Sequence, residues 1–450
     1  MTPEEIKKLS LEELIQIGEF PCACGHKHQA GIKRAVIESG AINKLSELLG
    51  EIGCKKPFVL SGKDSYAAAG ELVCAVLNRA EIPFGKYVFP VSPVKPTEQT
   101  GGSAVMHFDY SCDVIVAVGS GVINDTGKLL AHATGRKYMI VATAPSMDGF
   151  ASATSSMDMD GLKVSLNSTN AEIIVGDLDV LSQAPMHMLL AGVGDMLAKI
   201  ISLAEWRIAH LLVDEYYCPV VAALVERALD RVLQAAPMLM TRDKEAVAAV
   251  MEGLVIAGLA MKYAGLSRPA SGMEHYFSHI WDMRALAFKD AGCDLHGIQC
   301  GVGTLLSLKV YDYIRSVTPD KERALETAAN FSLEKWNEQL REFIGPGAEA
   351  MIAGEAREGK YCKEKHALRL ERIIKQWNEV QAIVSTLPSY ENVFELMRSL
   401  GAPTDVYYLG YTDEQLKKTF TMTKDIRDKY VASRLLWDLG LLEKAADTLF

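Results

Sequence analysis

The chain has 450 residues and a formal net charge of −10, and 49% of its residues are hydrophobic and 23% charged. This length exceeds one ordinary hydrophobic core, so we expect two domains. The acidic balance argues against nucleic acid or an anionic membrane as a partner, and no uninterrupted apolar run reaches membrane-spanning length. The nine cysteines form no framework pattern, and the N-terminus is typical of an acidic amphipathic helix rather than of a signal peptide. Together these features predict a cytoplasmic protein.

Short β-rich runs alternate with helical stretches in the first part of the chain. Apolar, β-branched runs in this alternation are typical of a parallel sheet covered by helices on both faces. Residues 152–170 interrupt the pattern and predict a hairpin or a loop excursion. The predicted strands lie in KPFVLSG (56–62), YVFPV (87–91), CDVIVAVGSG (112–121), YMIVATAPS (138–146) and AEIIVGDLDVLSQAP (171–185).

From residue 186 the sequence changes to long helical patterns, and no further strand is predicted. The sequence therefore predicts an α/β, Rossmann-like dinucleotide-binding domain over residues 1–185. An all-α domain that binds metal and substrate is predicted over residues 186–450.

A glycine-containing turn follows the predicted strand at 112–121. The strand leads into Gly119, Ser120 and Gly121, and a helix begins close to Asn124 and Asp125. Glycines at such a turn let the backbone approach a pyrophosphate, and the helix N-terminus supplies N–H groups and a positive dipole. The standard fingerprint is G-x-G-x-x-G, and Asn124 takes the place of its third glycine. The pattern favours phosphate binding and leaves a plain strand–helix turn as the alternative.

A second polar turn follows the next predicted strand. It contains Thr143, Ala144, Pro145 and Ser146 and continues into MDGFAS, which includes Asp148 and Ser152. Turns at the carboxyl ends of successive parallel strands converge on one ligand in folds of this class. The alternative is an ordinary loop.

The segment RPASGMEHYFSHIWDM (268–283) places His275 and His279 on one helical face. A zinc protease would need glutamate where Tyr276 stands, so that class is excluded. Asp195, in an apolar segment, and His296, in DLHGIQC, are further candidate metal ligands. One carboxylate and two imidazoles leave a coordination position open, which is typical of a catalytic zinc site. A helix cap, a loop histidine or buried hydrogen-bonded histidines remain the alternatives.

Five segments occur in an order that resembles sn-glycerol-1-phosphate dehydrogenases: GSGVINDTGK, TAPSMDGFAS, GVGDMLAK, RPASGMEHYFSH and HGIQCGVGT. These enzymes share a superfamily with iron-containing alcohol dehydrogenases, glycerol dehydrogenase and 3-dehydroquinate synthase, and the resemblance covers residues 55–305. It implies a dehydroquinate synthase-like fold. It also implies an oxidoreductase that interconverts dihydroxyacetone phosphate and sn-glycerol 1-phosphate with NAD or NADP and one divalent metal, zinc ahead of nickel or iron.

The resemblance further implies a role for each candidate residue. Asp195, His275 and His296 are the implied metal ligands, and His279 becomes a catalytic group that contacts either the substrate or a metal ligand. Asp195 also faces the substrate, Asp148 contacts it or the nicotinamide ribose, and Arg268 contacts its phosphate, with pairing of Arg268 to a helix end as the alternative. The implied cofactor-binding residues are Gly119, Ser120, Gly121, Val122, Ile123, Asn124, Asp125, Thr143, Ala144, Pro145, Ser146 and Ser152.

Three other functions remain open at this stage. They are a dehydrogenase for glycerol or another unphosphorylated polyol, a lyase like 3-dehydroquinate synthase, and a metal- and nucleotide-binding protein without catalysis. Analogy with the family predicts a homodimer or a higher homo-oligomer.

The segment FPCACGHKHQAG offers Cys22, Cys24, His26 and His28 close together. This spacing lacks the C-x₂₋₄-C pair and the separated second pair of a zinc finger. The sequence therefore predicts a structured N-terminal loop.

Overall fold

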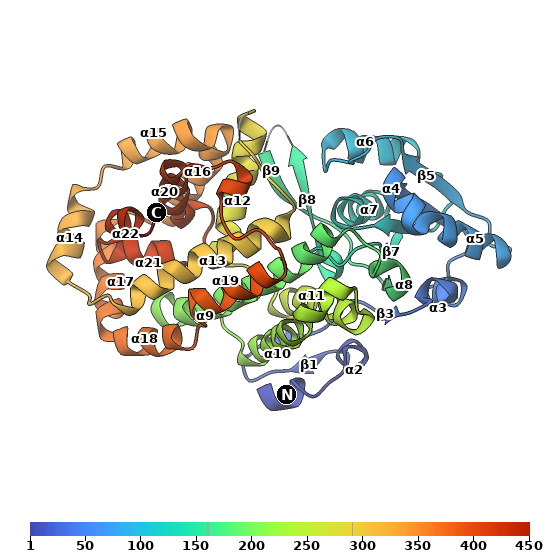
Figure 1. Ribbon diagram of the computed structural model, residues 1–450, viewed down its shortest axis with the longest axis horizontal. Coiled ribbons are helices and arrows are strands. Elements are labelled where there is room, and N and C mark those ends of the chain that lie inside the picture. Colours follow the sequence, from blue (N-terminus) through green and yellow to red (C-terminus); the bar gives the residue numbers. More distant parts are fainter. Residues whose placement is uncertain (160–161, 290) are drawn as a thin grey trace. The chain divides into compact units, whose positions relative to one another are not determined.

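The computed structural model describes residues 1–159, 162–289 and 291–450 (Figure 1). The chain divides into two compact units, a first unit of residues 1–196 and 219–267 and a second unit of residues 197–218 and 268–450. This division differs from the boundary predicted after residue 185, because two long helices later in the chain, at residues 219–235 and 244–264, belong to the first unit. At Gly176 in the last strand of the sheet, an added Cβ would lie 3.4 Å from Met251 of one of these helices.

The first unit contains a six-stranded sheet in the order β3-β10-β7-β6-β4-β5, with every neighbouring pair parallel. The predicted parallel α/β sheet is therefore confirmed. The strand at Arg34–Glu38 was not predicted, since its short run between charged residues carries little pattern. The strands are β3 (Arg34–Glu38), β4 (Pro57–Gly62), β5 (Gly85–Phe89), β6 (Val114–Gly119), β7 (Lys137–Ala142) and β10 (Ile173–Asp177).

Helices cover both faces of this sheet. On one face the valines of β4 and β6 pack against leucines and valines of α3 (Leu45–Glu51) and α5 (Glu71–Arg79). On the opposite face, Gly127 of α7 (Gly121–Thr134) approaches Ala117 of β6. Strands buried on both faces read as continuous apolar runs, which is why β4, β6 and β7 were recognisable in the sequence. The other first-unit helices are α1 (Pro3–Ile6), α2 (Leu11–Gln16), α4 (Lys63–Ser65), α6 (Glu98–Met106), α8 (Leu178–Leu181), α10 (Pro219–Ala235) and α11 (Lys244–Ala264).

The chain reverses its direction across the sheet between β4 and β6. It passes from β4 to β5 on one side and then returns to β6 on the other, so β4 and β6 are neighbours. The two strand ends are joined by Ser61, whose Oγ donates to the carbonyl of Val118 at 2.9 Å. Open α/β sheets bind ligands outside the carboxyl ends of the strands at such a reversal. The glycine turn after β6 lies at that point.

The predicted excursion at residues 152–170 contains an antiparallel pair, β8 (Thr154–Met159) and β9 (Leu162–Asn167). Residues 160–161, between the two strands, lie outside the described residues. In the part of the chain that the structure describes, no strand follows Asp177, in agreement with the sequence.

The second unit is helical, and α9 (Met186–Val213) runs without a break from the first unit into it. Two helices, α9 and α11, are long and apolar enough to span a membrane, but 83% of each apolar window is buried, as in the core helices of a soluble protein. The remaining helices are α12 (Met273–Ala287), α13 (His296–Arg315), α14 (Lys321–Asn330), α15 (Leu333–Ile344), α16 (Ala348–Glu358), α17 (Lys363–Lys375), α18 (Trp377–Ser385), α19 (Tyr390–Ser399), α20 (Asp413–Met422), α21 (Ala432–Asp438) and α22 (Leu442–Leu449).

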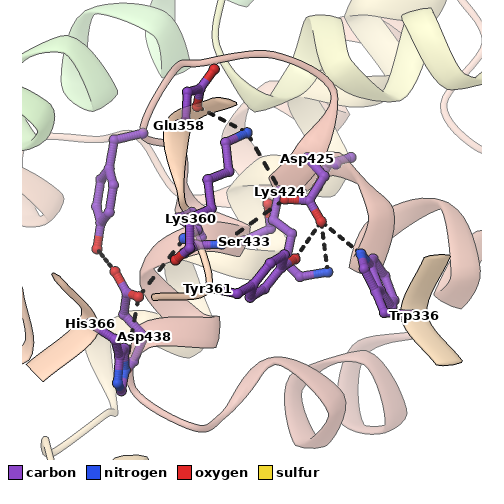
Figure 2. Close-up of polar contacts among 12 residues, drawn as sticks. Trp336, Glu358, Lys360, Tyr361, His366, Lys424, Asp425, Ser433 and Asp438 are labelled. Carbon is purple, nitrogen blue, oxygen red and sulfur yellow. Dashed lines mark hydrogen bonds and ion pairs between the residues drawn. The ribbon is translucent and has the colours of Figure 1, made fainter. Parts of the chain in front are cut away.

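Buried ion pairs fasten the C-terminal helices of the second unit, as Figure 2 shows. The carboxylate of Asp425 accepts the Trp336 indole N–H at 2.8 Å and lies 3.3 Å from the ammonium of Lys424. Tyr361 donates its hydroxyl to the same carboxylate. Charges in a protein interior need such partners, so this network fixes the C-terminal segment to α15.

Candidate functional site

The structure brings the two predicted turns of the first unit together. Ser120 separates β6 from α7, and its Oγ lies 2.5 Å from the Oγ of Ser146. The backbone N–H of Thr143 donates to the carbonyl of Gly119 at 3.0 Å. The two loops therefore meet at the carboxyl edge of the sheet, where the sequence placed a shared ligand.

The glycine turn differs from the standard fingerprint at the position of the third glycine. Asn124 occupies the third-glycine position, and its amide donates to the carbonyl of Gly149 at 3.2 Å while accepting the Tyr138 hydroxyl at 3.0 Å. One turn later, a Cβ on Gly127 would lie 2.8 Å from the Cβ of Ala117. Gly127 thus allows the close helix–strand packing that the third glycine usually provides, and Asn124 ties the helix to the second loop.

Two features of the turn suit the pyrophosphate of a dinucleotide. A Cβ on Gly119 would lie 2.6 Å from the side chain of Ile123, so only glycine fits there. The first N–H groups of α7 have no partner within the helix, and the dipole makes this end positive. The residues present therefore fit the phosphates of a dinucleotide.

A buried lysine that sequence analysis missed joins the two loops. Lys128 on α7 is completely buried, and its ammonium lies 2.9 Å from a carboxylate oxygen of Asp125. The same ammonium donates to the carbonyl of Gly149 at 3.1 Å and to Oγ of Ser152 at 3.3 Å. Lysine is rarely buried without partners, and here the partners lie on both loops. Nothing in the sequence around Lys128 indicated that its side chain would be buried between the two loops.

The loop that contains Asp148 is clamped by two helices of the first unit. A Cβ on Gly192 of α9 would lie 2.0 Å from the carbonyl oxygen of Pro145, and one on Gly258 of α11 would lie 2.8 Å from that of Asp148. The backbone N–H of Asp148 donates to Oδ2 of Asp195 at 2.9 Å. Asp195, a predicted metal ligand, is therefore buried and held by the second loop.

In the second unit, small residues let α12 and α13 pack closely. A Cβ on Gly303 of α13 would lie 2.5 Å from the carbonyl oxygen of Glu274 on α12. This approach brings together two predicted ligands, and the ring centroids of His275 and His296 lie 4.9 Å apart. The glycines of the HGIQCGVGT segment thus allow α12 and α13 to pack closely, and the same segment contains His296.

The same cluster includes Cys300, which sequence analysis did not select. Its Sγ lies 3.5 Å from Nε2 of His296, one turn earlier on α13. The ligand atoms of His275, His296 and Cys300 all lie within 4.8 Å of one another. The H-x₃-C spacing in HGIQC places both side chains on one helical face, and that spacing was the available indication.

His279 lies beside this cluster rather than inside it. Its ring centroid is 6.4 Å from that of His275 and 6.1 Å from that of His296. The half-buried His279 therefore stands one turn further along α12. Of the two histidines four residues apart in the sequence, His275 therefore lies within the cluster and His279 lies next to it.

Hydrogen bonds to Nδ1 orient both clustered imidazoles. Nδ1 of His275 lies 2.9 Å from Oε1 of Glu274, and Nδ1 of His296 lies 3.0 Å from Oγ of Ser278. A partner on one ring nitrogen assigns the other nitrogen to a metal. The carboxylate of Glu274 accepts from Nδ1 of His275, so Nε2 is the nitrogen of that ring that a metal would use, whereas the hydroxyl of Ser278 can either donate to Nδ1 of His296 or accept from it.

Two buried carboxylates, those of Glu205 and Glu274, lie next to Gly272 at the start of α12. A Cβ on Gly272 would touch both Glu205 and Glu274, at 2.5 and 2.8 Å. Burial raises the pKa of each carboxyl to about 7. Burial also lowers the pKa of Lys429 to about 7, and its ammonium donates to the carbonyl of Ser271 at 2.8 Å. Neither Glu205 nor Lys429 was selected from the sequence.

Arg268, the predicted phosphate contact, is fully buried in the second unit. Its Nε lies 3.2 Å from a carboxylate oxygen of Glu215, and Nη2 donates to the carbonyl of Glu205 at 3.0 Å. Its guanidinium also donates to the carbonyl of Tyr430. These contacts link Arg268 to segments of the second unit that are far apart in the chain. They favour a structural role, which is the alternative to phosphate binding.

Comparison with known proteins agrees with this geometry. The profile of iron-containing alcohol dehydrogenases matches residues 36–185. The glycerol-1-phosphate dehydrogenase [NAD(P)+] of Halalkalibacterium halodurans is 34% identical over 296 residues, covering 64% of this chain and 73% of the relative. The chain belongs to the glycerol-1-phosphate dehydrogenase family. Its relative of the same name from Bacillus licheniformis is 27% identical over 94% of this chain and 93% of its own length.

Solved structures confirm the predicted fold of this family member. Glycerol dehydrogenase from Schizosaccharomyces pombe superimposes with a TM-score of 0.58 at 16% identity, covering 93% of this chain and 90% of that one. Maleylacetate reductase from Agrobacterium tumefaciens gives a TM-score of 0.59 at 15% identity, covering 95% and 99%. At these identities the likeness establishes the dehydroquinate synthase-like fold alone.

Proposed function

We propose that this protein is a metal-dependent, NAD(P)-linked oxidoreductase that interconverts dihydroxyacetone phosphate and sn-glycerol 1-phosphate. The observation that carries the proposal is the cluster of His275 and His296, whose rings are 4.9 Å apart and each oriented through Nδ1. Relatives that bear the name glycerol-1-phosphate dehydrogenase [NAD(P)+] support the substrate and the cofactor.

Asp195 is the third ligand in this proposal. It lies one helical turn before Lys199 on α9, and Lys199 donates to the carbonyl of Ala270 at 3.2 Å. Ser202, further along the same helix, donates to the carbonyl of Pro269 at 3.1 Å. The second-unit half of α9 therefore lies along the segment that leads into the helix of His275. A fully buried carboxylate also needs a cation or several donors to balance its charge.

One carboxylate and two imidazoles suit zinc, nickel or iron, and we propose zinc. When bound, the metal supplies Lewis acidity toward the substrate oxygen, and the nicotinamide exchanges a hydride with the substrate carbon. In this proposal Cys300 is not a ligand, so Asp195, His275 and His296 leave a fourth coordination position to an exogenous ligand, which is the pattern of a catalytic zinc.

The chain's own residues bind and orient the reactants. Gly119–Asp125 bind the cofactor phosphates through backbone N–H groups, and Thr143–Ser146 with Ser152 flank the dinucleotide. Asp148 holds Asp195 through its backbone N–H, and its side chain is the proposed contact to the substrate or the nicotinamide ribose. His279 exchanges a proton with the substrate oxygen. We assign Arg268 to the ion pairs within the second unit rather than to the substrate phosphate.

The proposal includes the cellular setting. We take the protein to be a cytoplasmic homodimer or higher homo-oligomer that acts on a small phosphorylated polyol and its ketone, without a nucleic-acid or membrane partner. The structure describes all nine cysteines and joins none of them in a disulfide, which suits a reducing compartment.

The test is oxidation of NADH or NADPH in the presence of dihydroxyacetone phosphate, before and after treatment with a chelator. We expect turnover that chelation abolishes and that zinc, nickel or iron restores. Equal turnover of unphosphorylated dihydroxyacetone would identify a polyol dehydrogenase instead. Full activity of metal-free protein would contradict the metal role. The product is then offered to a glycerol-3-phosphate dehydrogenase, which we expect to leave it unreacted because the stereochemistry is opposite.

A further inference from the structure

The N-terminal segment that sequence analysis predicted to be a structured loop forms a tight hairpin. Strands β1 (Phe20–Pro21) and β2 (Lys27–His28) pair antiparallel. The backbone N–H of Cys22 donates to the carbonyl of His26 at 3.1 Å, and Gly25 turns the chain at φ +86°. The turn brings Sγ of Cys24 to 3.4 Å from Nε2 of His28. The ligand atoms of Cys22, Cys24 and His28 lie within 4.8 Å of one another.

His28 is oriented as a metal ligand is. The ring is fully buried, and its Nδ1 lies 2.7 Å from the carbonyl oxygen of Tyr263. Because a carbonyl accepts only, this contact makes Nδ1 the protonated nitrogen and leaves the lone pair on Nε2. Nε2 is also the atom next to the Cys24 thiol. Fixing the tautomer through a backbone carbonyl is how proteins prepare histidine for a metal.

The helix pair of α10 and α11 brings a fourth ligand to the same place. These consecutive helices pack on each other with a short connection between them, so they run antiparallel (Figure 1). The start of α10 at Pro219 therefore lies at the same end of the pair as Tyr263, in the last turn of α11. Cys218 directly precedes Pro219 and is fully buried, and the peptide bond fixes it at that end.

The N-terminal segment is also fastened along this helix pair. The guanidinium of Arg227 on α10 donates to the carbonyl of Lys7 at 3.0 Å and to that of Leu9. The hydroxyl of Tyr263 donates to the carbonyl of Leu14 at 2.8 Å. Tyr263 at the end of α11 thus contacts the chain both before the cysteines, at Leu14, and after them, at His28.

We propose that Cys22, Cys24, His28 and Cys218 bind one zinc ion in a structural site separate from the proposed catalytic metal. Three thiolates and one imidazole form a closed tetrahedral set, which is the pattern of structural zinc. Soft thiolate ligands favour zinc over magnesium or calcium. The sequence shows no local second pair of zinc ligands, because the other two ligands are His28 and Cys218, which lie nearly 200 residues apart in the chain. The ion would cross-link the N-terminal segment to the start of α10.

The first test compares the metal content of purified wild-type protein with that of two variants. In Cys22→Ser/Cys24→Ser we expect one bound zinc fewer per chain than in wild type. Cys362→Ser is the matched control, since that thiol only donates to Glu364 at the start of α17. We expect its zinc content to equal that of wild type. Equal zinc content in all three proteins would overturn the proposal.

The second test uses cobalt in place of zinc. Cobalt bound by thiolates gives a charge-transfer band in the near ultraviolet, and we expect a wild-type minus Cys22→Ser/Cys24→Ser difference spectrum that contains it. Cys300 is unchanged in both proteins, so the difference reports on the hairpin. His28→Cys keeps a four-thiolate set, and we expect it to retain the band. A cobalt-loaded wild type without a thiolate band would contradict the site even if a variant failed to fold.

A third protein separates this site from the proposed function. Asp195→Asn/His275→Ala removes two proposed catalytic ligands and leaves the hairpin intact. We expect this variant to lose activity and to keep one zinc per chain, and its cobalt-loaded form to keep the thiolate band. Loss of all metal in it would overturn the structural site, while retention of activity would overturn the catalytic assignment instead.

Discussion

Oε1 of Glu274 lies 2.9 Å from Nδ1 of His275, its neighbour in the chain. Adjacent helical residues point in different directions, so this contact forms only because the glutamate folds back over the start of α12, where it also accepts the backbone N–H of Gly272 at 2.6 Å. The carboxylate is fully buried. It fixes the ring so that Nε2 is the atom that would bind the proposed metal.

Replacing Glu274 by alanine should weaken metal binding without removing a ligand. Loss of a carboxylate that orients a ligand histidine typically lowers metal affinity about 10-fold to 100-fold. Competition against a chromophoric chelator measures the change. Glu338→Ala, at an exposed position on α15, is the control and should bind metal like wild type. Unchanged affinity in Glu274→Ala would show that the contact does not tune the site.

Replacing Asp195 by asparagine should remove the charged ligand and preserve the fold. The amide oxygen can still accept the N–H of Asp148, so thermal unfolding should change little. Because Lewis acid catalysis contributes several kcal/mol, we expect kcat/KM to fall about a thousandfold or more. Asp230→Asn, exposed on α10, is the matched control. A variant that binds metal and turns over normally would refute the ligand assignment.

Replacing Lys128 by methionine tests the link between the two loops. The substitution keeps the apolar stem but leaves Asp125 and the carbonyl of Gly149 without the ammonium. Removing one partner of a buried ion pair costs about 3 kcal/mol of unfolding free energy or more, measurable by urea unfolding. Lys44→Met is the control, because its exposed ion pair with Glu38 is worth at most about 1 kcal/mol.

The same Lys128→Met variant should bind the dinucleotide more weakly. Lys128 holds the second loop beside the glycine turn, and the loop's position decides whether both turns reach one ligand. Titration with NADH or NADPH, followed by fluorescence, measures the affinity. Affinity equal to that of Lys44→Met would mean that the loop keeps its place without the lysine.

The sequence predicted the sheet and the turns because both depend on local pattern. The runs of β4 and β6 are apolar on both faces, and the glycines after β6 mark the turn directly. His275 and His296 were recognisable through motif resemblance. Cys218 and Glu205 were not, because their roles arise only from packing between elements far apart in the chain. For Arg268 the motif position predicted a phosphate contact, which remains a prediction, and the structure adds that its buried guanidinium lies against the carboxylate of Glu215.

Replacing Asp425 by alanine should destabilise the second unit. Lys424 and the Trp336 indole would lose their buried partner (Figure 2). Uncompensated buried charge typically costs about 3 to 5 kcal/mol. Urea unfolding followed by tryptophan fluorescence measures the loss. Asp447→Ala removes an exposed ion pair with Lys417 and should change stability by less than about 1 kcal/mol. Equal midpoints for the two variants would show that the network adds no stability.

Replacing Glu205 by glutamine should flatten the pH dependence of stability. Burial raises the pKa of Glu205 from 4.5 to about 7, although the carboxylate accepts the backbone N–H groups of Met273 at 2.9 Å and Ala432 at 2.8 Å. A folded-state pKa above the unfolded value means that the folded protein binds more protons between these two pH values. Stability is therefore highest below about pH 4.5 for this group and falls as the pH rises through about 7. Glutamine does not titrate, so unfolding free energies of Glu205→Gln at about pH 5 and about pH 7.5 should differ less than those of wild type, and the slope that remains comes from the other groups that titrate in this range, among them Glu274 and Lys429. Parallel profiles for the variant, wild type and the exposed control Glu338→Gln would show that Glu205 stays ionised throughout this range.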